Sequence, residues 1–431
     1  MKFTRYMLAF AATGALLAVA AGPMSGAQAA CTHKVGSVLS LTGSYGAFGV
    51  PISKAAQLGV EQVNAARKAL GVGCGLVYDV RDSQTQASVA VDAARKLIDL
   101  EGVTALVGPI SSGITAPLLT SVTVEKNVVL VATASTSSTF TNMGREGKTK
   151  GLFFRTLPAD SLQAVATAKM AWDVGLRHVG IIYLNNDWGK NNQAEFIRAF
   201  KALGGKIGNV VPFNPDQPSY RSEVNKAMEG GVDSLYLLSQ PQDGIKQVRE
   251  WIRFGGPEKY VFPQGMNDSA FVEKIGADLL KDGWFISPGT PDTPSVKTME
   301  ADYQKRFDLS PKGPGRTSGY DSGVLISLAM VAADMGGKDI KGGTLANIIR
   351  NITGTEGEAV YAGVEGLKKA ITLLKAGKKI RYVGATGPIN FDAYGDVALP
   401  FVGMQFRGGE FVDAMSISLQ DVAKVKAMAN K

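Results

Sequence analysis

Hydroxyl and glycine residues gather in three short segments that each follow an apolar run of the sequence. These segments are residues 41–49 (LTGSYGAFG), 108–113 (GPISSG) and 132–139 (ATASTSST). Their hydroxyls and backbone N–H groups could bind an anion without a formal positive charge. Charge-assisted hydrogen bonds contribute about 1.5–3 kcal/mol each, so three or four of them would hold a buried carboxylate. Serine and threonine also serve as helix N-caps and turn residues, which is the alternative explanation for any one of these segments.

Amide and aromatic residues occupy a second set of segments, farther along the chain. These are residues 185–189 (NNDWG), 239–244 (SQPQDG) and 263–268 (PQGMND). An aromatic group opposite a hydroxyl surface suits a small ligand with an apolar body and a polar end. Trp188 could equally be an ordinary packing residue at an interface.

Residue patterns typical of catalysis or metal binding are missing from the sequence. His33 and His178 are the only histidines, and neither has a second histidine or cysteine at metal-ligand spacing. No G-x-S-x-G motif occurs, and the glycine-rich residues 71–75 precede an apolar run instead of following one. The sequence therefore predicts a binding protein that is not an enzyme and that has no metal and no cofactor.

Strand-like and helix-like segments alternate along most of the chain. The apolar runs at residues 34–41, 76–82, 103–108 and 128–135 are separated by segments with helical periodicity, and a second series begins near residue 161. This order predicts an α/β protein with parallel, doubly wound sheets. Ligands bind at the carboxyl ends of the strands in such sheets, and both sets of segments described above follow strands.

The length of the chain and its coarse duplication predict two lobes. About 400 residues exceed what a single core organises. Prolines at Pro158, in residues 287–294 and in residues 386–388 mark three crossings between the lobes, with the ligand cleft between them. The expected division is residues 1–29 as a leader, residues 30–154 with 290–386 as the first lobe, and residues 155–289 with 387–431 as the second.

The first 29 residues have the organisation of a secretory signal peptide. Lys2 and Arg5 precede an apolar run that ends in small residues around Ala27 and Ala29, with cleavage expected after about Ala29. The run is shorter than the ~20 apolar residues that a membrane-spanning helix needs. Cys31 could anchor a lipoprotein, but Gln28 stands where such signals place a branched apolar residue. The sequence therefore predicts an exported protein.

Charge and cysteine content limit the possible partners. The formal charge is +8, but basic and acidic residues are interleaved, so we expect no nucleic-acid partner. Cys31 and Cys74 each precede a predicted strand. If those strands are neighbours, the cysteines lie side by side and can form a disulfide after export; two free thiols are the alternative.

The chain resembles periplasmic binding proteins of bacterial ABC importers, in the leucine/isoleucine/valine-binding branch. The segments that carry this resemblance are LSLTGSYGAFG, VGPISSGITAP, VLVATASTSS, FFRTLPAD, YLNNDWG, Gly319–Asp321 (GYD) and GATGPINFDAYGD. The resemblance covers nearly the whole chain after the leader. It implies a monomeric periplasmic protein with two lobes that close on a small carboxylate-bearing ligand and then dock on an inner-membrane permease. The same fold also permits an exported sensing module that signals to a partner.

The resemblance also implies ligand-binding positions. The carboxylate positions fall on Ser112 and on the loop residues Ala134, Ser135 and Thr136, and the aromatic positions fall on Phe48 and Trp188. Two positions depart from the family pattern, because Gln264 stands where amino-acid binders place an acid for the ligand ammonium, and Gln240 stands at an aromatic position. Either another acid supplies the counter-charge, with Asp187, Asp243 and Asp268 as candidates, or the ligand has no ammonium group.

Overall fold

The computed structural model describes Met1 and residues 31–289 and 291–430. The predicted leader, residues 1–29, lies outside the described residues except for Met1. The chain forms two units, Met1–Cys31 and Thr32–Lys431, and the fold belongs to the second. Among the described residues, no helix combines the length and apolar character needed to cross a membrane.

Five parallel strands form the first sheet, in the order β2-β1-β3-β4-β5. Its side chains alternate between two faces, because Val129 and Val131 enter one hydrophobic core whereas Leu130 and Ala132 enter the core on the opposite face. Burial on both faces explains why these strands are continuous apolar runs. The strand bounds are β1 (Thr32–Leu39), β2 (Gly75–Asp82), β3 (Ala105–Val107), β4 (Val129–Ala132) and β5 (Phe153–Arg155).

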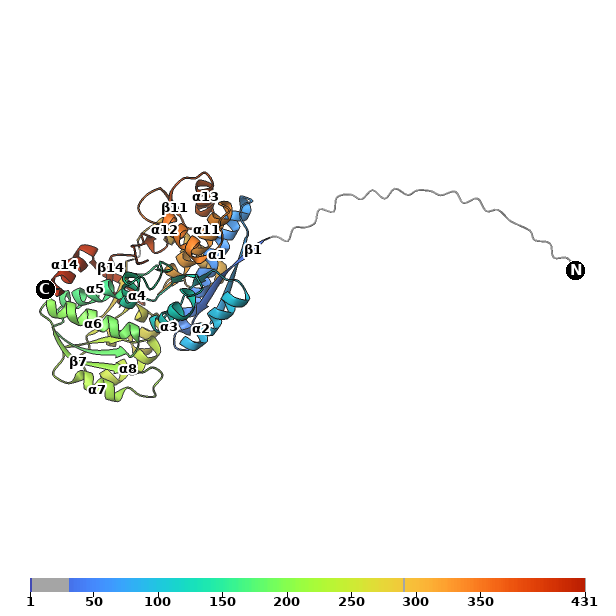
Figure 1. Cartoon of the computed structure of the whole chain (residues 1–431). Helices are drawn as coiled ribbons and strands as arrows, with labels where there is room; N and C mark the ends of the chain where they lie inside the picture. The colour runs from blue at the N-terminus through green and yellow to red at the C-terminus, as the bar shows by residue number, and fades with distance from the viewer. Residues whose placement is uncertain (2–30, 290, 431) are drawn as a thin grey trace. The chain divides into compact units, whose positions relative to one another are not determined.

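Helices cover both faces of the first sheet. Those on one face include α1, which packs along α11, and those on the other include α2 and α3 (Figure 1). Short π-helical segments, η1 and η2, continue α2 and α3. The bounds are α1 (Gly46–Ala69), α2 (Ala87–Arg95), η1 (Lys96–Leu100), α3 (Ser112–Leu118), η2 (Leu119–Thr123), α4 (Ser138–Arg145), α10 (Pro294–Phe307), α11 (Arg316–Met335), α12 (Gly342–Ile352) and α13 (Val364–Lys375).

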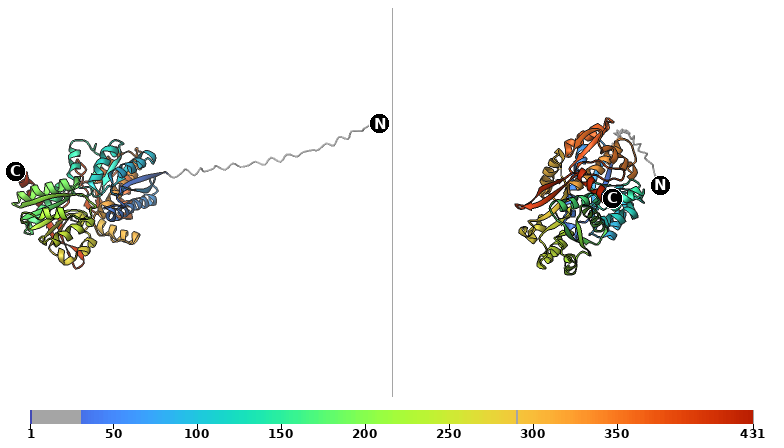
Figure 2. Two further views of the ribbon diagram at one scale, coloured as in Figure 1. Left: turned by 90° about the horizontal axis from the view of Figure 1, so that it is seen from below. Right: turned by 90° about the vertical axis from the view of Figure 1, so that its left-hand side faces the viewer.

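The second sheet repeats the strand order of the first and adds a hairpin. Its parallel strands follow the order β7-β6-β8-β9-β10, which has the same connectivity as β2-β1-β3-β4-β5, so the predicted duplication is confirmed. Figures 1 and 2 show its green-to-yellow elements grouped apart from the blue ones of the first sheet. The bounds are β6 (His178–Leu184), β7 (Lys206–Phe213), β8 (Ser234–Leu238), β9 (Tyr260–Phe262), β10 (Gly283–Pro288), α5 (Asp160–Asp173), α6 (Asp187–Ala202), α7 (Arg221–Met228), α8 (Pro241–Arg253), η3 (Gln264–Met266), α9 (Ser269–Ile275), η4 (Ala277–Leu280) and α14 (Leu419–Ala429).

Some elements differ from the expectation of purely parallel sheets. The apolar stretch near residue 400 folds into an antiparallel hairpin, β14 (Phe401–Arg407) and β15 (Glu410–Ile417), which extends the second sheet. Gly408 and Gly409 have φ values of 61° and 90°, as the tight hairpin turn requires. A small third sheet, β11 (Glu358–Tyr361), β12 (Ile380–Gly384) and β13 (Gly387–Pro388), was not expected. Helix α10 was not expected either, because the proline-rich residues 287–294 predict a crossing between the lobes. Thr293 is the N-cap residue of α10, and Pro294 lies in its first turn.

Two sets of hydrophobic cores define the two lobes. The first lobe comprises the first sheet, its helices and the third sheet, since Val360, Ile380 and Tyr382 belong to the core formed by α1 and α11. The second lobe comprises the second sheet and its helices. The chain passes between the lobes after β5, after β10 and before β14. Ile389 and Val397 still lie in the first core, and Phe401 lies in the second.

A buried carboxylate braces the segment that leads to the last crossing. Asp321 of α11 is fully buried and accepts hydrogen bonds from Tyr382 Oη (2.9 Å), the Ala385 N–H (2.8 Å), and both the N–H and Oγ1 of Thr386 (2.7 and 2.6 Å). A Cβ at Gly384 would lie 2.5 Å from this carboxylate, so only glycine permits the approach. Burial raises the pKa of Asp321 to about 6, which still leaves it ionised at neutral pH.

Replacement of Asp321 by asparagine tests this brace. Asp321→Asn keeps the shape but places an NH2 group opposite two of the four donors, so we expect a loss of about 2–4 kcal/mol in the free energy of unfolding at pH 7. Urea unfolding followed by circular dichroism measures the change. Asp339→Asn, at an exposed position, is the control and should change stability by less than about 0.5 kcal/mol. Equal effects of the two variants would contradict the brace.

Candidate functional site

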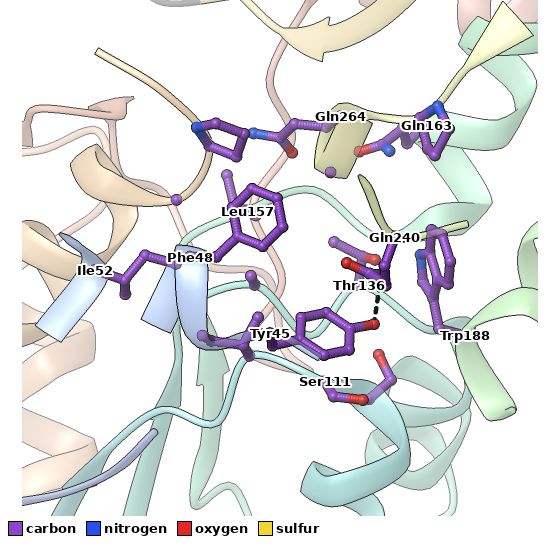
Figure 3. A pocket seen from close by; sticks show the side chains of 17 residues that line it. Tyr45, Phe48, Ile52, Ser111, Thr136, Leu157, Gln163, Trp188, Gln240 and Gln264 are labelled. Carbon is purple, nitrogen blue, oxygen red and sulfur yellow. Dashed lines mark hydrogen bonds between the residues drawn. The ribbon is translucent and has the colours of Figure 1, made fainter. Parts of the chain in front are cut away.

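A cavity lies where loops after the strands of both sheets meet, and its volume is about 70 Å³. The first-lobe loops follow β1, β3 and β4, and the second-lobe residues follow β6, β8 and β9. Segments after β5 and before α11 complete the wall (Figure 3). The lining residues are Tyr45, Phe48, Ile52, Ile110, Ser111, Ser112, Ala134, Thr136, Leu157, Gln163, Trp188, Gln240, Pro263, Gln264, Gly265, Pro314 and Gly315.

The structure brings together seven of the eight residues predicted for the ligand site. Those that line the cavity are Phe48, Ser112, Ala134, Thr136, Trp188, Gln240 and Gln264.

Ser135 is the exception. Its side chain is fully buried beneath the loop, where Oγ lies 2.6 Å from Thr115 Oγ1 and donates to the carbonyls of Pro109 and Ile110 at 3.2 Å. The Ser135 side chain therefore supports the loop and does not line the cavity that Ala134 and Thr136 line, and its expected contact with ligand stays a prediction.

Hydroxyl groups form the first-lobe side of the cavity. Ser112 begins α3, and its Oγ accepts a hydrogen bond from the Ser137 N–H at 3.2 Å. This bond joins the loop after β3 to the loop after β4, so that Ser111, Ser112 and Thr136 line one cavity. The Ser112 hydroxyl proton remains available to a ligand, because the oxygen acts only as an acceptor toward Ser137.

A buried guanidinium holds the loop after β4 from below. Arg155 Nη1 donates to the carbonyls of Ser135 (3.2 Å) and Ser137 (2.8 Å), while Nε pairs with Asp396 Oδ1 at 2.6 Å. The C=O and N–H of one trans peptide point in opposite directions, so the Thr136 N–H points away from the guanidinium. The loop can therefore offer backbone and side-chain donors at Thr136 together.

Aromatic side chains line much of the remaining wall, and a hydrogen bond joins the two lobes there. Trp188 lies in the first turn of α6, and Phe48 and Tyr45 lie at the start of α1. Gln240, the N-cap residue of α8, donates from Nε2 to Tyr45 Oη at 2.7 Å, which is the dashed line in Figure 3. Tyr45 is deeply buried, and burial raises its pKa well above the usual value, so its phenol stays protonated.

Several lining residues were not predicted from the sequence. Tyr45 and Ser111 lie in residues 41–49 and 108–113, two of the loops predicted to contact the ligand, so their place in those loops is a sequence signal. Gln163 lies one turn after Asp160 in α5. Because α5 begins at the first crossing between the lobes, a residue one turn into this helix lies near the cleft, and this spacing is a signal for Gln163. Pro314 and Gly315 lie in an irregular segment before α11 that carries no signal of its own.

Among the described residues, no Asp, Glu, Lys, Arg or His lines the cavity. Of the three acids considered as counter-charges, Asp187 accepts a hydrogen bond from Thr139 Oγ1 (2.9 Å), and Asp243 accepts one from Tyr220 Oη (2.6 Å). Asp268 caps α9 and lines an adjoining, wider cleft of about 680 Å³. The wall formed by the described lining residues is therefore uncharged and largely apolar.

Among the described residues, one group of side chains has the residue types that bind metal ions, and it consists of His33, Cys74 and Asp334. His33 Nε2 lies 2.9 Å from Asp334 Oδ1. Cys31 and Cys74 are disulfide-bonded, in agreement with the expected bridge, because Thr32 of β1 pairs with Gly75 of β2. The Cys74 sulfur is therefore not a thiolate ligand, and none of the three residues lines the cavity.

A second buried carboxyl group lies beside the cavity. Asp160 begins α5, its N–H donates to the Thr136 carbonyl at 2.7 Å, and its Oδ1 accepts from Asn192 Nδ2 at 2.9 Å. Its Oδ2 is buried and has no hydrogen-bond partner among residues 31–289 and 291–430. Burial raises the pKa of Asp160 to about 7, although Arg155 acts in the opposite direction.

The raised pKa of Asp160 predicts a pH-dependent stability. Between about pH 4 and pH 7 the folded protein keeps a proton on Asp160 that the unfolded chain releases. The contribution of Asp160 to the free energy of unfolding therefore decreases as pH rises and is constant above about pH 7. The unfolding free energy of the wild type minus that of Asp160→Asn should therefore fall by roughly 2–3 kcal/mol from pH 5 to pH 7. Urea unfolding at several pH values measures it, with exposed Asp282→Asn as the control. A difference that stays constant from pH 5 to pH 7 would show that Asp160 is ionised throughout this range and would contradict the prediction.

Comparison with known proteins agrees with this architecture. A family model described as periplasmic binding protein matches residues 32–393. The chain is 27% identical over 367 residues to the chemotactic signal transduction system substrate-binding protein BasB of Halobacterium salinarum, which covers 83% of each chain.

Solved structures share the fold at lower identity. A branched-chain amino acid transporter substrate-binding protein of Streptococcus pneumoniae, in complex with isoleucine, has a TM-score of 0.71 and 20% identity, covering 90% of this chain and 99% of that one. An ABC transporter solute-binding protein of R. palustris, in complex with benzoate, has a TM-score of 0.70 and 16% identity, covering 90% and 96%. Since the family model spans most of the sequence and these structures share its two-lobed fold, the chain belongs to the periplasmic binding protein family.

Proposed function

We propose that this protein captures a small carboxylate-bearing solute without an ammonium group in the periplasm and delivers it to an ABC permease as a monomer. The observation that carries this proposal is the uncharged cavity, which has hydroxyls on its first-lobe side and no acidic or basic side chain among the described lining residues. Such a wall can stabilise one negative charge through hydrogen bonds, but it offers no counter-charge for a cation.

The carboxylate would lie against Ser112, Ala134 and Thr136. Backbone N–H and hydroxyl donors to a carboxylate contribute about 1.5–3 kcal/mol each, so a few of them offset its desolvation. Arg155 lies beneath the same loop, where its charge favours an anion without contacting it.

The absence of an ammonium group follows from Gln264. An amino-acid ligand would bury its ammonium in a cavity whose described lining residues include no carboxylate, which costs several kcal/mol. The neighbours in complex with isoleucine and with benzoate indicate that one fold accommodates either ligand class, so the lining residues must decide between them.

Acids matched to amino acids test the ligand class. 4-Methylpentanoate is leucine without its amino group, and 3-phenylpropanoate is phenylalanine without its amino group. By isothermal titration calorimetry we expect at least one acid to bind about 100-fold or more tightly than its amino acid. Tight binding of leucine with no response to either acid would contradict the proposal.

Serine variants test the position of the carboxylate in the same experiment. Ser112→Ala removes one donor to the ligand and should weaken binding of the acid by about 10- to 100-fold. Ser121→Ala, at an exposed position in the same helical segment, should leave binding unchanged. Thermal unfolding of both variants establishes that they are folded.

Closure of the two lobes on the ligand is the proposed mechanism. The expected lobes are residues 30–154 with 290–386 and residues 155–289 with 387–431. The core positions of Val397 and Phe401 favour moving the last crossing from residue 386 to a point between these two residues. Hydrogen bonds that join the lobes near the cavity include Gln240 to Tyr45, Thr139 to Asp187 and the Asp160 N–H to the Thr136 carbonyl. A ligand that contacts both lobes favours the closed form by its differential affinity for that form.

Small-angle X-ray scattering tests closure. We expect the radius of gyration to fall when a binding acid is added to the wild type. Tyr45→Phe loses the bond to Gln240, so it should have a larger radius without ligand and still become compact with it. Ligand that binds without any change in the radius would contradict closure.

A sensing role is the second candidate, and the similarity to BasB favours it. A sensor and an importer subunit can share this fold and this cavity. Uptake of radiolabelled acid by cells that lack the protein separates the two roles, because loss of uptake supports transport and unchanged uptake with lost chemotaxis supports sensing.

A further inference from the structure

Two glutamine side chains on the second-lobe side of the cavity have amide oxygens without a partner. Gln163 and Gln240 are 3% and 4% exposed, and both line the cavity (Figure 3). Oε1 of each is buried and accepts no hydrogen bond from any residue among 31–289 and 291–430. Buried polar groups in proteins are nearly always paired, so two unpaired acceptors on one cavity call for an explanation.

The orientation of Gln240 is set by its other amide atom. Nε2 donates to Tyr45 Oη at 2.7 Å, which leaves Oε1 as the atom without a partner. The backbone carbonyl of Gln163 accepts from Thr167 Oγ1 at 2.8 Å within α5, and its side chain lines the cavity. Both elements belong to the second lobe, whereas the hydroxyls proposed for the carboxylate belong to the first.

The chemistry of these atoms limits what can pair with them. Amide oxygens accept hydrogen bonds, so the complementary group must donate an O–H or an N–H. A cationic donor is disfavoured, because the described lining residues include no acid to balance its charge. A neutral hydroxyl or amide N–H can donate to these oxygens and needs no counter-charge.

We propose that the solute carries, besides its carboxylate, a neutral hydroxyl or amide N–H that donates to Gln163 and Gln240. This inference rests on the proposed function, since it names the second polar group of the same ligand. A site built to pair with such a group rejects an analogue that lacks it, because the analogue leaves the buried acceptors unpaired. The glutamines therefore set specificity, and the first-lobe hydroxyls hold the charge shared by all the acids.

Pairs of acids that differ by one hydroxyl test the inference. The probes are 3-phenylpropanoate with 3-(4-hydroxyphenyl)propanoate, and hexanoate with 6-hydroxyhexanoate. By calorimetry we expect the hydroxylated member of at least one pair to bind the wild type about 10-fold or more tightly than its partner. Gln163→Met or Gln240→Met should reduce this preference to about twofold or less, whereas Gln304→Met, at an exposed position of α10, should retain it.

Two further measurements separate recognition from a structural role. Tyr45→Phe removes the partner that orients the Gln240 amide but leaves Gln163 unchanged, so the hydroxyl preference should fall without being lost. Gln163→Met removes an unpaired buried acceptor, so its melting temperature without ligand should equal or exceed that of the wild type. A residue that served only packing or folding would instead lose stability and leave the preference unchanged.

The outcomes are distinct from those that test the carboxylate proposal. Equal binding within both pairs, or a preference that survives both glutamine variants, overturns this inference and leaves carboxylate capture in place. Failure of every acid to bind, hydroxylated or not, overturns the proposed function together with the inference.

Discussion

The buried guanidinium of Arg155 is the interaction on which the site depends. The side chain is fully buried and its partners come from separate parts of the chain: the carbonyls of Ser135 and Ser137, Thr141 Oγ1 at 2.8 Å and the Asp396 carboxylate. A buried cation must have all such partners in place, since an unpaired charge in the interior costs several kcal/mol. The loop after β4, the start of α4 and the segment before β14 are therefore held together, and the hydroxyl side of the cavity lies on top of them.

The distribution of charge around the cavity follows from the same constraint. Arg155, Asp160 and Asp321 are all buried near the crossings, and none of them lines the cavity. Arg155 pairs with Asp396, Asp321 accepts four hydrogen bonds from neutral groups, and Asp160 accepts one from Asn192, so all three organise the surrounding loops. The cavity wall itself is left neutral, which allows it to hold a carboxylate through oriented dipoles and disfavours a ligand with an additional charge.

Several buried polar atoms near the cavity have no hydrogen-bond partner within the described part of the chain, and each of them lowers the stability of the fold. Gln163 Oε1, Gln240 Oε1 and Asp160 Oδ2 have no hydrogen-bond partner within the described part of the chain. Asp160 also connects the loop after β4 to Asn192 of α6, and Asn192 accepts from Tyr236 Oη at 2.6 Å. Polar contacts of this kind run from the first-lobe loop into the second lobe, so a change in one wall of the cavity can reach the other.

The sequence by itself determined the α/β class, the coarse duplication into two α/β units and the loops that line the cavity, because apolar periodicity and strand-to-helix alternation are local properties. It also located the departure at Gln264, since the identity of a residue at a strand end needs no coordinates. Only the tertiary structure separated Ser135 from Ala134 and Thr136, because the direction of each side chain depends on the conformation of the loop. In that conformation Arg155 donates to the Ser135 carbonyl, and Ser135 Oγ donates to the Pro109 carbonyl. The third sheet and the contributions of Gln163, Pro314 and Gly315 also depend on packing between segments more than a hundred residues apart, which no local pattern encodes.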